Sequence, residues 1–391
     1  MRILARSATV LGLLALAATG WAGGQHHVSA GSDVVGYVYV NDNTAGTNTV
    51  AGFGRHVDGT LTSLSGSPFS VGGAGTGSAI GSQGALQLSS DGRYLLAVDA
   101  GSDQISVLRI RHDGSLRLVE DSPVSSQGKE PVSIAVNEAL VYVANTGAGG
   151  ANYTGFVLSH GGHLRPLAGS SVSLPDGSGL GDVLFNADGT RLVGVRVTTS
   201  KIDSFVVGSD GRLTPAPGSP FSAQAAGPFG SEFRPTNPTQ LFVSNAHAGP
   251  GNGSVSAFND AADGSLSSIG ASPFADNQTA PCWVTISADG SYLFTSNTAS
   301  DSVSRYAIAT DGSLSLLGST MLTGGSGLKP VDLRLNPSGS NLYVVDSSNA
   351  RVSAFSVSGG NLNELSGSPF ALPTGAAPFG LVVTDQGDES D

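Results

Sequence analysis

Cysteine, charged residues and aromatic residues are all scarce in this sequence. Cys282 is the only cysteine among 391 residues, so no internal disulfide can form. Charged residues make up 12% of the chain, and 18 Lys and Arg face 30 Asp and Glu, for a formal net charge of -12. That balance argues against nucleic acid and anionic membranes as partners, because both bind basic patches. We predict neither partner.

Several short motifs of catalysis and cofactor binding are also absent. No Gly-x-Ser-x-Gly elbow occurs, which argues against a serine hydrolase. The glycine-rich run 72–84 precedes a strand rather than a helix, so it does not match a dinucleotide-binding loop. No His, Cys and Asp residues have the spacing of zinc ligands, and no calcium-loop pattern is present. We therefore predict no metal and no cofactor.

Helical periodicity is confined to the N-terminus, where a basic start and a short apolar run, 10–18, are followed by small residues. This order is typical of a secretory signal peptide. The run is shorter than the about 20 residues that cross a bilayer, so no membrane span is predicted. Cleavage after Ala22 and cleavage after Ala30 both fit. We predict a signal peptide over 1–22, a flexible leader over 23–34 and a secreted protein.

Glycine, by contrast, is abundant and regularly placed. There are 56 glycines, roughly twice the usual share. An Asp-Gly or Gly-Gly turn recurs at spacings of 55, 48, 49, 53, 48 and 48 residues, at Asp58-Gly59, Asp113-Gly114, Gly161-Gly162, Asp210-Gly211, Asp263-Gly264, Asp311-Gly312 and Gly359-Gly360. Each repeat reads as four short strands joined by tight turns. Such a sheet cannot bury both its faces alone and needs copies of itself as neighbours.

The repeats predict an all-β fold, a seven-bladed β-propeller with four antiparallel strands in each blade. We expect one domain over 35–385, a monomer, and an acidic tail over 386–391. The first repeat lacks its innermost strand, and the segment 378–384 matches the innermost strands of the other repeats. Pairing the two chain ends would close the ring and remove exposed sheet edges.

The last residue of each predicted second strand is Asn or Asp in six repeats and arginine, Arg196, in the remaining one. A short Asn or Asp side chain can hydrogen-bond its own backbone and begin the following loop. Arg196 cannot do so. Two interpretations stay open: it extends into solvent or pairs with an acid, or it binds a carboxylate or phosphate.

Charged side chains occur on only some of the predicted innermost strands. Asp182 and Asp332 align at one level, and Glu232 and Arg334 align at the next. A charged side chain near a central channel costs free energy unless it is paired with an opposite charge or hydrated. These residues therefore either pair between blades or line a throat that binds a ligand. With Trp283, which lies on an innermost strand, Asp182, Asp332 and Arg334 are our substrate-binding candidates.

His247 follows the second strand of the fifth repeat, on the face of the ring where Arg196 is expected. Histidine is suited to moving a proton near neutral pH. Our catalytic hypothesis has Arg196 binding a carboxylate, His247 as general acid and base, and Glu232 orienting the substrate. The alternative is that His247 is simply an exposed loop residue.

The sequence resembles the lactonase-type seven-bladed β-propellers over about residues 35–385. The likeness rests on "SADGSYLFTSN", "SVSRYAI", "TDGSLSLLG" and the Ser-Pro-Phe stops that follow most repeats. The family includes proteins like bacterial 6-phosphogluconolactonase and carboxymuconate cyclase. The resemblance implies a small lactone bound at the channel mouth by His, Arg and carboxylate groups without a metal.

Two functions are therefore expected. In the first, the protein is a metal-independent enzyme that hydrolyses or forms a small lactone of a sugar acid or similar carboxylate. In the second, it is a non-catalytic ring that binds an extracellular ligand, glycan or protein.

Overall fold

A computed structural model describes residues 33–386. The predicted signal peptide (1–22), all but the last two residues of the predicted leader (23–34) and all but the first residue of the acidic tail (386–391) lie outside the described residues. In the part of the chain that is described, every regular element is a strand. No helix long and apolar enough to cross a membrane is found there.

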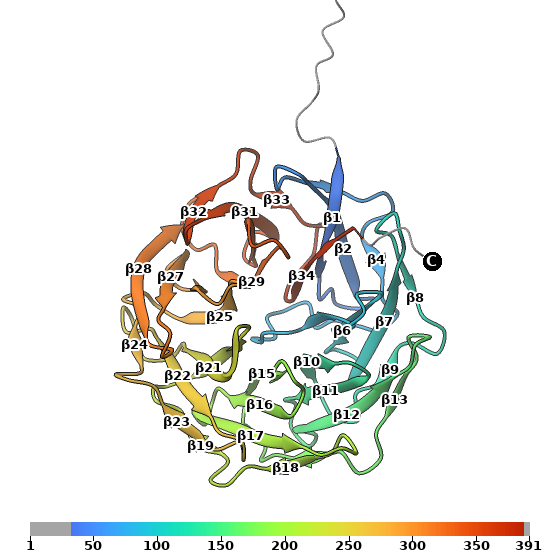
Figure 1. The fold of residues 1–391 in the computed structure, drawn as a ribbon. Helices are drawn as coiled ribbons and strands as arrows, with labels where there is room; N and C mark the ends of the chain where they lie inside the picture. The colour runs from blue at the N-terminus through green and yellow to red at the C-terminus, as the bar shows by residue number, and fades with distance from the viewer. Residues whose placement is uncertain (1–32, 387–391) are drawn as a thin grey trace, which may run out of the picture. The chain divides into compact units, whose positions relative to one another are not determined.

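The strands form seven antiparallel sheets arranged as a ring, which confirms the predicted seven-bladed propeller (Figure 1). We number the blades 1–7 in chain order. Their inner strands are, in that order, β34 (Leu381–Asp385), β5 (Leu86–Leu88), β10 (Pro131–Asn137), β15 (Leu180–Phe185), β20 (Pro228–Arg234), β25 (Pro281–Ile286) and β29 (Pro330–Leu335).

The next two layers outward carry most of the buried apolar side chains. The second strands are β1 (Val34–Asn41), β6 (Tyr94–Asp99), β11 (Leu140–Asn145), β16 (Arg191–Arg196), β21 (Asn237–Asn245), β26 (Tyr292–Asn297) and β30 (Asn341–Asp346). The third strands are β2 (Thr49–His56), β7 (Gln104–Ile110), β12 (Asn152–Leu158), β17 (Lys201–Val207), β22 (Ser254–Asp260), β27 (Ser302–Ile308) and β31 (Arg351–Ser358).

The outer strands are interrupted in six blades. Their first parts are β3 (Leu61–Ser63), β8 (Leu116–Leu118), β13 (Leu164–Pro166), β18 (Leu213–Pro215), β23 (Leu266–Ser268) and β32 (Asn361–Glu364). After a turn the chain pairs with the same third strand again, as β4 (Phe69–Ser70), β9 (Val124–Ser125), β14 (Val172–Ser173), β19 (Phe221–Ser222), β24 (Phe274–Ala275) and β33 (Phe370–Ala371). The expected stop is therefore a break within the outer strand. In five of the six blades a Ser-Pro pair lies in the break, where proline cannot donate a ladder hydrogen bond, and the outer strand of blade 3 is broken without one.

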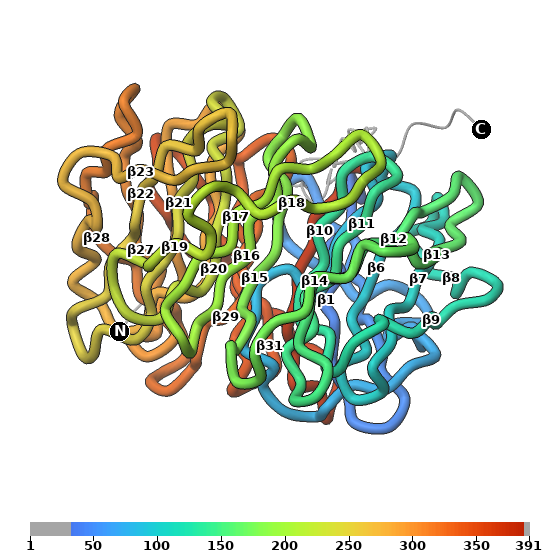
Figure 2. Tube along the Cα trace, turned by 90° about the horizontal axis from the view of Figure 1, so that it is seen from below, coloured from blue at the N-terminus to red at the C-terminus, as the bar shows by residue number. Residues whose placement is uncertain are grey.

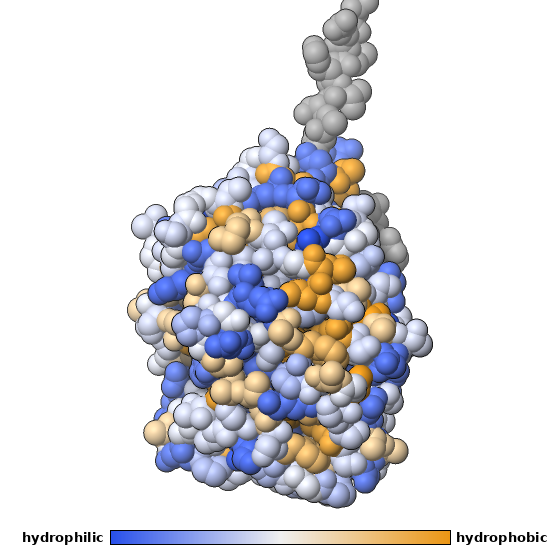
Figure 3. All heavy atoms as spheres, turned by 90° about the vertical axis from the view of Figure 1, so that its left-hand side faces the viewer, coloured by the Kyte–Doolittle hydropathy of each residue, from blue (hydrophilic) through white to orange (hydrophobic). Residues whose placement is uncertain are grey.

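Blade 6 has an unbroken outer strand, β28 (Leu314–Met321), and no proline at the position of the break. Its exposed side chains include Leu317 and Met321, at 46% and 59% exposure. Figure 3 views the side of the ring where β28 and β32 lie, and apolar groups there are interspersed with polar ones. Scattered apolar side chains of this kind are ordinary on a protein surface.

The ring is closed by its two chain ends, as the sequence predicts. β34 pairs antiparallel with β1, with Val40 opposite Leu381 and Tyr37 opposite Thr384. Arg55 in β2 donates hydrogen bonds to the Thr384 carbonyl at 3.1 Å and to the Asp385 carboxylate at 2.5 Å. Closure pairs the two chain ends within one sheet, so the ring keeps only short, protected strand edges.

Neighbouring blades are joined by tyrosines from the second strands. Tyr39 donates to the Gly114 carbonyl at 2.7 Å, and Tyr343 donates to the Gly59 carbonyl at 2.8 Å. Each acceptor lies in the turn before the outer strand of the next blade. At Gly114, φ is +76° and an added Cβ would lie 2.3 Å from the Tyr37 ring. The recurrent Asp-Gly and Gly-Gly turns thus serve packing between blades as well as chain reversal.

The channel is filled at one end by the segment before β5, drawn in light blue near the centre of Figure 1. Gln83 donates from its backbone N–H to the Gly181 carbonyl at 2.8 Å and from its amide to the Ser231 carbonyl at 2.9 Å, and its amide oxygen accepts the Val284 N–H at 2.9 Å. A blade 2 segment therefore crosses the channel to bind blades 4, 5 and 6. This is the glycine-rich run of the sequence.

An aromatic cluster lies against that segment. The buried Trp283 ring has its centroid 5.0 Å from that of Phe229 and 6.0 Å from that of Phe379, and its indole N–H donates to the Ser82 carbonyl at 2.8 Å. All three rings belong to the beginning of an inner strand or the residues just before one. We call this end of the ring, where inner strands begin, the plugged end, and the opposite end the open end. The edge-on trace in Figure 2 shows the loops gathered at these two ends.

Candidate functional site

A cavity of about 380 Å³ lies where the inner strands end. Its volume is within the range of about 300–1,000 Å³ that is common for small-molecule sites. The wall comes from the inner strands of blades 2, 3, 4, 5 and 7, and the residues that line it with polar or charged groups are Gln83, Gln87, Asp182, Ser231, Glu232 and Arg334. Gln83, from the plugging segment, shows that the cavity is closed on its inner side.

Glu232 and Arg334 face this cavity from β20 and β29. Among the described residues the Glu232 carboxylate has no hydrogen-bond partner, although the side chain is half-buried. Burial raises the pKa of Glu232 to about 7, with Asp182 and Asp332 adding to the rise and Arg334 opposing it. A carboxylate poised near neutral pH is suited to take and return a proton.

The Arg334 guanidinium keeps most of its donors available. It donates one hydrogen bond, from Nη1 to the Leu333 carbonyl at 3.3 Å, and the same nitrogen lies 3.7 Å from an oxygen of Asp332. The carboxylates of Asp332, Glu232 and Asp182 hold the pKa of Arg334 above its ordinary value, so the group stays charged. A fixed cation with free N–H groups can bind or polarise an oxygen atom of a ligand.

Asp182 and Asp332 hold blades together. Asp182 accepts the backbone N–H of Ser231 at 3.0 Å and the Ser231 hydroxyl at 2.8 Å, while Asp332 accepts the backbone N–H of Leu381 at 3.0 Å. In both cases the donor lies on the inner strand of the next blade. The two alternatives raised by the sequence therefore coexist, because Asp182 both bridges blades and lines the cavity.

Ser133 is a member of this arrangement that the sequence reasoning missed. It occupies in β10 the position that Asp182 occupies in β15, since each pairs with the residue before the last of its second strand. Its hydroxyl donates to Asp182 at 3.2 Å and accepts the Val183 N–H at 3.1 Å. The repeat register was the signal that could have found it, but serine is too common on strands to stand out.

Trp283 lies in the plug rather than on the cavity wall. The residue is 2% exposed, and its one polar atom is engaged by Ser82. Among the described residues it is not part of the cavity lining. The structure therefore gives Trp283 a supporting position behind the floor of the cavity instead of the contact with substrate that we expected.

Arg196 is held by an acid of its own blade. Its guanidinium donates two hydrogen bonds to Asp203, Nε at 2.7 Å and Nη2 at 2.5 Å, and the Tyr153 hydroxyl donates to the same carboxylate at 3.0 Å. Of the two interpretations left open by the sequence, pairing with an acid is the one that the structure contains. The bidentate geometry uses the donors that a ligand carboxylate would need.

The equivalent positions in other blades explain the exception. Asn245 donates to the hydroxyls of Ser254 and Ser256 at 3.1 and 2.8 Å, and Asn297 makes the same pair of contacts in blade 6. In blade 4 the second of those hydroxyl positions is Asp203, so an arginine replaces the amide. Blade 4 therefore has the charged pair Arg196 and Asp203 where blades 5 and 6 have a neutral amide and a neutral hydroxyl.

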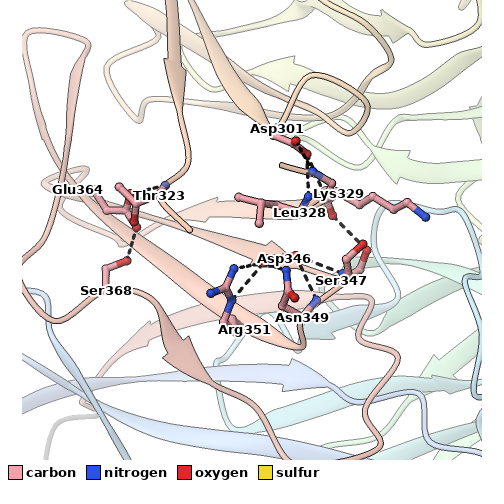
Figure 4. A network of polar contacts seen from close by, with 12 residues as sticks. Asp301, Thr323, Leu328, Lys329, Asp346, Ser347, Asn349, Arg351, Glu364 and Ser368 are labelled. Atoms are coloured by element: carbon pink, nitrogen blue, oxygen red, sulfur yellow. Dashed lines mark hydrogen bonds and ion pairs between the residues drawn. The ribbon is translucent and has the colours of Figure 1, made fainter. Parts of the chain in front are cut away.

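Blade 7 carries a third version of this contact (Figure 4). Asp346, at the end of β30, accepts hydrogen bonds from Arg351 at 2.7 Å and from the backbone N–H of Ser348 at 3.2 Å. The strand-end side chain thus accepts the expected hydrogen bond from its own loop in blade 7, and in blade 1, where Asn41 accepts the Asn43 N–H at 3.1 Å. The expectation is wrong for blades 3, 5 and 6, because within the described part of the chain no hydrogen-bond partner contacts the side-chain oxygens of Asn145, Asn245 and Asn297.

His247 and Arg196 do not lie at the level of Glu232. Arg196 is opposite Leu180, the first residue of β15, and Asn245 is opposite Pro228, the first residue of β20. Glu232 lies four residues further along β20, roughly 10–13 Å at about 3.3 Å per residue. His247 is an exposed loop residue whose ring covers Gly227. The three residues of our catalytic hypothesis are therefore distributed between the two ends of the ring, with only Glu232 at the cavity.

Another hollow, of about 500 Å³, lies at the plugged end outside the channel. Loops supply most of its wall, and its one lysine, Lys129, is paired with Asp103 at 2.6 Å. Within residues 33–386 no group of three or more His, Cys, Asp and Glu side chains could hold a metal ion. Cys282 is buried, and burial raises the pKa of its thiol to about 12, so the side chain is inert as a nucleophile.

Comparison with known proteins identifies the fold family. The model of the lactonases with a seven-bladed β-propeller matches residues 37–156 and 233–387. The chain belongs to this lactonase family. The match includes Arg334 and the last two residues of β20, and it does not include Glu232, Asp182 or Arg196. None of the curated proteins matches the sequence.

Solved structures with the same fold resemble this lactonase-family chain over nearly its whole length. A putative 6-phosphogluconolactonase from Bacteroides fragilis is 20% identical, with a TM-score of 0.70 over 90% of this chain and 98% of that one. The periplasmic gluconolactonase of Pseudomonas aeruginosa is 16% identical, with a TM-score of 0.70 over 89% and 99%. A protein from Lactobacillus plantarum is 17% identical, with a TM-score of 0.71 over 89% and 99%. At these identities the similarity establishes the fold alone.

Proposed function

We propose that this propeller binds a small lactone in the open-end cavity and hydrolyses it to the hydroxy acid. The observation that carries the proposal is the pair Glu232 and Arg334, a carboxylate without a hydrogen-bond partner and a largely unengaged guanidinium that face the same cavity. A lactonase-type role is in keeping with the family, and the names of two structural neighbours point to lactones of sugar acids.

In the proposed reaction Glu232 acts as the general base. It takes a proton from a water molecule as the water oxygen bonds to the lactone carbonyl carbon, and the carbonyl π electrons move to the oxygen. Arg334 donates hydrogen bonds to that oxygen as its negative charge develops. The tetrahedral intermediate then collapses, the ring C–O bond breaks, and the departing ring oxygen takes the proton back from Glu232.

Asp182 and Asp332 are positioning residues in this scheme. Each is held by a backbone N–H of the next blade, so neither carboxylate is free to move toward a ligand. Their charges keep Arg334 protonated and raise the pKa of Glu232. Arg196 and His247 have no step in this reaction, because they lie at the plugged end.

The test is acid release from a panel of aldonolactones, measured against the uncatalysed rate. We expect turnover by the wild-type protein and a loss of about 10²–10³-fold in kcat for Arg334→Gln, which removes the donor to the developing oxyanion. Arg165→Gln is the matched control, because Arg165 is an exposed arginine on the outer strand of blade 3. It should keep the wild-type rate.

Background rates for the wild-type protein on every lactone of the panel would contradict the proposal. The protein would then be the non-catalytic binding ring of our second expectation. The proposed steps use side chains only, so we also expect a chelator to leave the rate unchanged.

We propose in addition that the protein is exported and acts outside the cytoplasm. The support is the sequence pattern of residues 1–22. Expression of the full chain followed by N-terminal sequencing of the extracytoplasmic fraction tests this. A mature protein that begins at Gly23 or Gly31 agrees with the proposal, and an intracellular protein that retains Met1 contradicts it.

A further inference from the structure

The charges around the cavity are strongly unequal. Among the described residues that line it, Arg334 is the one cation, and it faces three carboxyl groups. Asp182 and Glu232 line the cavity, and Asp332 lies directly behind Arg334. Asp182 and Asp332 both act through space on the charge of Glu232. The guanidinium is therefore already balanced before any ligand enters.

The turns at the open end carry acids and arginines together: Arg93 pairs with Asp91 at 2.8 Å, and Arg191 acts through space on Asp188. The turns that follow the inner strands lie at the open end, and four of them carry an acid, Asp91, Glu138, Asp188 and Asp289. Three of these acids accept hydrogen bonds from their own turns, which keeps them ionised; the clearest case is Asp188, whose carboxylate accepts from Thr190 and has its pKa lowered by that contact. The whole chain has a formal net charge of -12.

We infer that the open-end cavity selects lactones and hydroxy acids without a phosphate group and rejects their phosphorylated counterparts. The inference rests on the proposed function and deepens it by naming the substrate class. A sugar lactone is neutral and its hydroxyl groups can exchange hydrogen bonds with Gln83, Gln87 and the carboxylates. A phosphate ester carries about two negative charges, and in this cavity it would meet one balanced guanidinium and three acids.

A phosphate site requires features that the described part of this cavity lacks. Phosphate groups in proteins are held by clusters of Arg and Lys or by several backbone N–H groups that point at the ligand. Here the inner-strand N–H groups of Ser231 and Leu381 are taken by Asp182 and Asp332. The like charges that remain repel an anion over a few ångströms in a half-buried site, where water screens them poorly.

Titration calorimetry with gluconate and 6-phosphogluconate at low salt tests the inference. The two probes share a carboxylate and differ only in the phosphate, so their ratio isolates its effect. We expect 6-phosphogluconate to bind at least about 10-fold more weakly than gluconate, and we expect the gap to narrow as salt is added. Glu232→Gln removes one of the repelling charges and should narrow the gap too. Glu120→Gln, which removes an equal charge from the outer edge of blade 2, should leave it unchanged.

Equal or tighter binding of 6-phosphogluconate overturns the inference, and so does failure of both acids to bind. Rates of lactone hydrolysis separate this outcome from the fate of the proposed function. Hydrolysis with preference for the phosphorylated lactone would overturn the inference and leave the hydrolase standing. Selective binding of gluconate without hydrolysis of any lactone would leave the inference standing and overturn the hydrolase.

Discussion

The two ends of the channel are built from the same seven inner strands and differ in what those strands carry. At the plugged end the strands begin with apolar residues, and Trp283 packs with Phe229 and Phe379 against the segment that crosses the channel. At the open end the same strands carry Asp182, Glu232 and Arg334 around a cavity. The comparison indicates that one end supplies stability and the other supplies chemistry.

Removal of the general base should give the largest effect on activity. Glu232→Gln keeps the size of the side chain and loses the proton acceptor, so we expect kcat for lactone hydrolysis to fall by about 10²–10⁴-fold. Because Glu232 has no hydrogen-bond partner to lose, the free energy of unfolding should not decrease. Steady-state rates and urea titrations on the same preparations measure the two quantities. A variant with wild-type turnover would remove Glu232 from the mechanism.

Replacement of Trp283 at the plugged end should reduce stability strongly and activity only slightly. Trp283→Ala leaves a cavity between two rings and removes the hydrogen bond to Ser82, so we expect about 3–5 kcal/mol less stability. Urea denaturation measures this loss. In the fraction that remains folded, the hydrolysis rate should change much less than in Glu232→Gln. A stability equal to wild type would show that the aromatic cluster does not support the ring, and the contrast between the two ends would fail.

The ion pair of blade 4 tests the same contrast at the plugged end. Arg196→Ala leaves the 2%-exposed Asp203 side chain without its cation, so we expect about 3 kcal/mol of destabilisation. Arg196→Asn combined with Asp203→Ser restores the amide and the second of the two hydroxyls found in blades 5 and 6, and it should recover most of the lost stability. Denaturant titration of both variants measures this.

Lactone hydrolysis by the double variant should match wild type. Loss of turnover in a folded Arg196→Asn, Asp203→Ser protein would instead favour the original hypothesis that Arg196 binds the substrate carboxylate.

The last prediction concerns the pH dependence of stability. Burial raises the pKa values of Asp182 and Glu232 to about 7 in the folded protein, above those of exposed acids, near 4. Between about pH 4 and pH 7 the folded state therefore holds protons that the unfolded state releases, so stability should fall as pH rises through this window. Arg334 lowers the pKa values of both groups, while Asp182 and Asp332 raise that of Glu232.

Melting temperatures at pH 5 and pH 8 measure this dependence. Glu232→Gln should show a smaller decrease than wild type, because one of the buried acids with a raised pKa no longer titrates, while Glu120→Gln should follow wild type. Activity should change in the opposite sense, since the general base works only when deprotonated. We expect kcat/KM to rise through a limb near pH 7. Equal melting temperatures of the wild-type protein at pH 5 and pH 8 would contradict the raised pKa values.

Local sequence pattern was sufficient to predict most of the fold. The Asp-Gly turns place the outer strands, and residues 378–384 were recognisable as a missing inner strand because they repeat the pattern of the other six. Such signals are local, and in a repeat fold each of them recurs in every repeat, which makes them easier to recognise. The break within the outer strands was not anticipated, because Ser-Pro-Phe reads as a stop unless the third strand is long enough to pair on both sides of it.

The candidate site was predicted only in part. Asp182, Glu232 and Arg334 were singled out correctly as inner-strand charges near the channel, because register alone brings them there. The same register singled out Arg196 as a possible ligand-binding residue, but in the structure it pairs with Asp203. The pair could not be predicted because Asp203 lies on another strand and no local pattern links the two residues.

The sequence by itself determined that seven sheets form a ring closed by the chain ends, because turns, strand lengths and apolar alternation act within each repeat. Only the tertiary structure decided which end of the channel is open. That depends on Gln83 crossing to three other blades and on side chains about 50–200 residues apart meeting at the centre, since loop closure over such distances leaves no trace in local pattern.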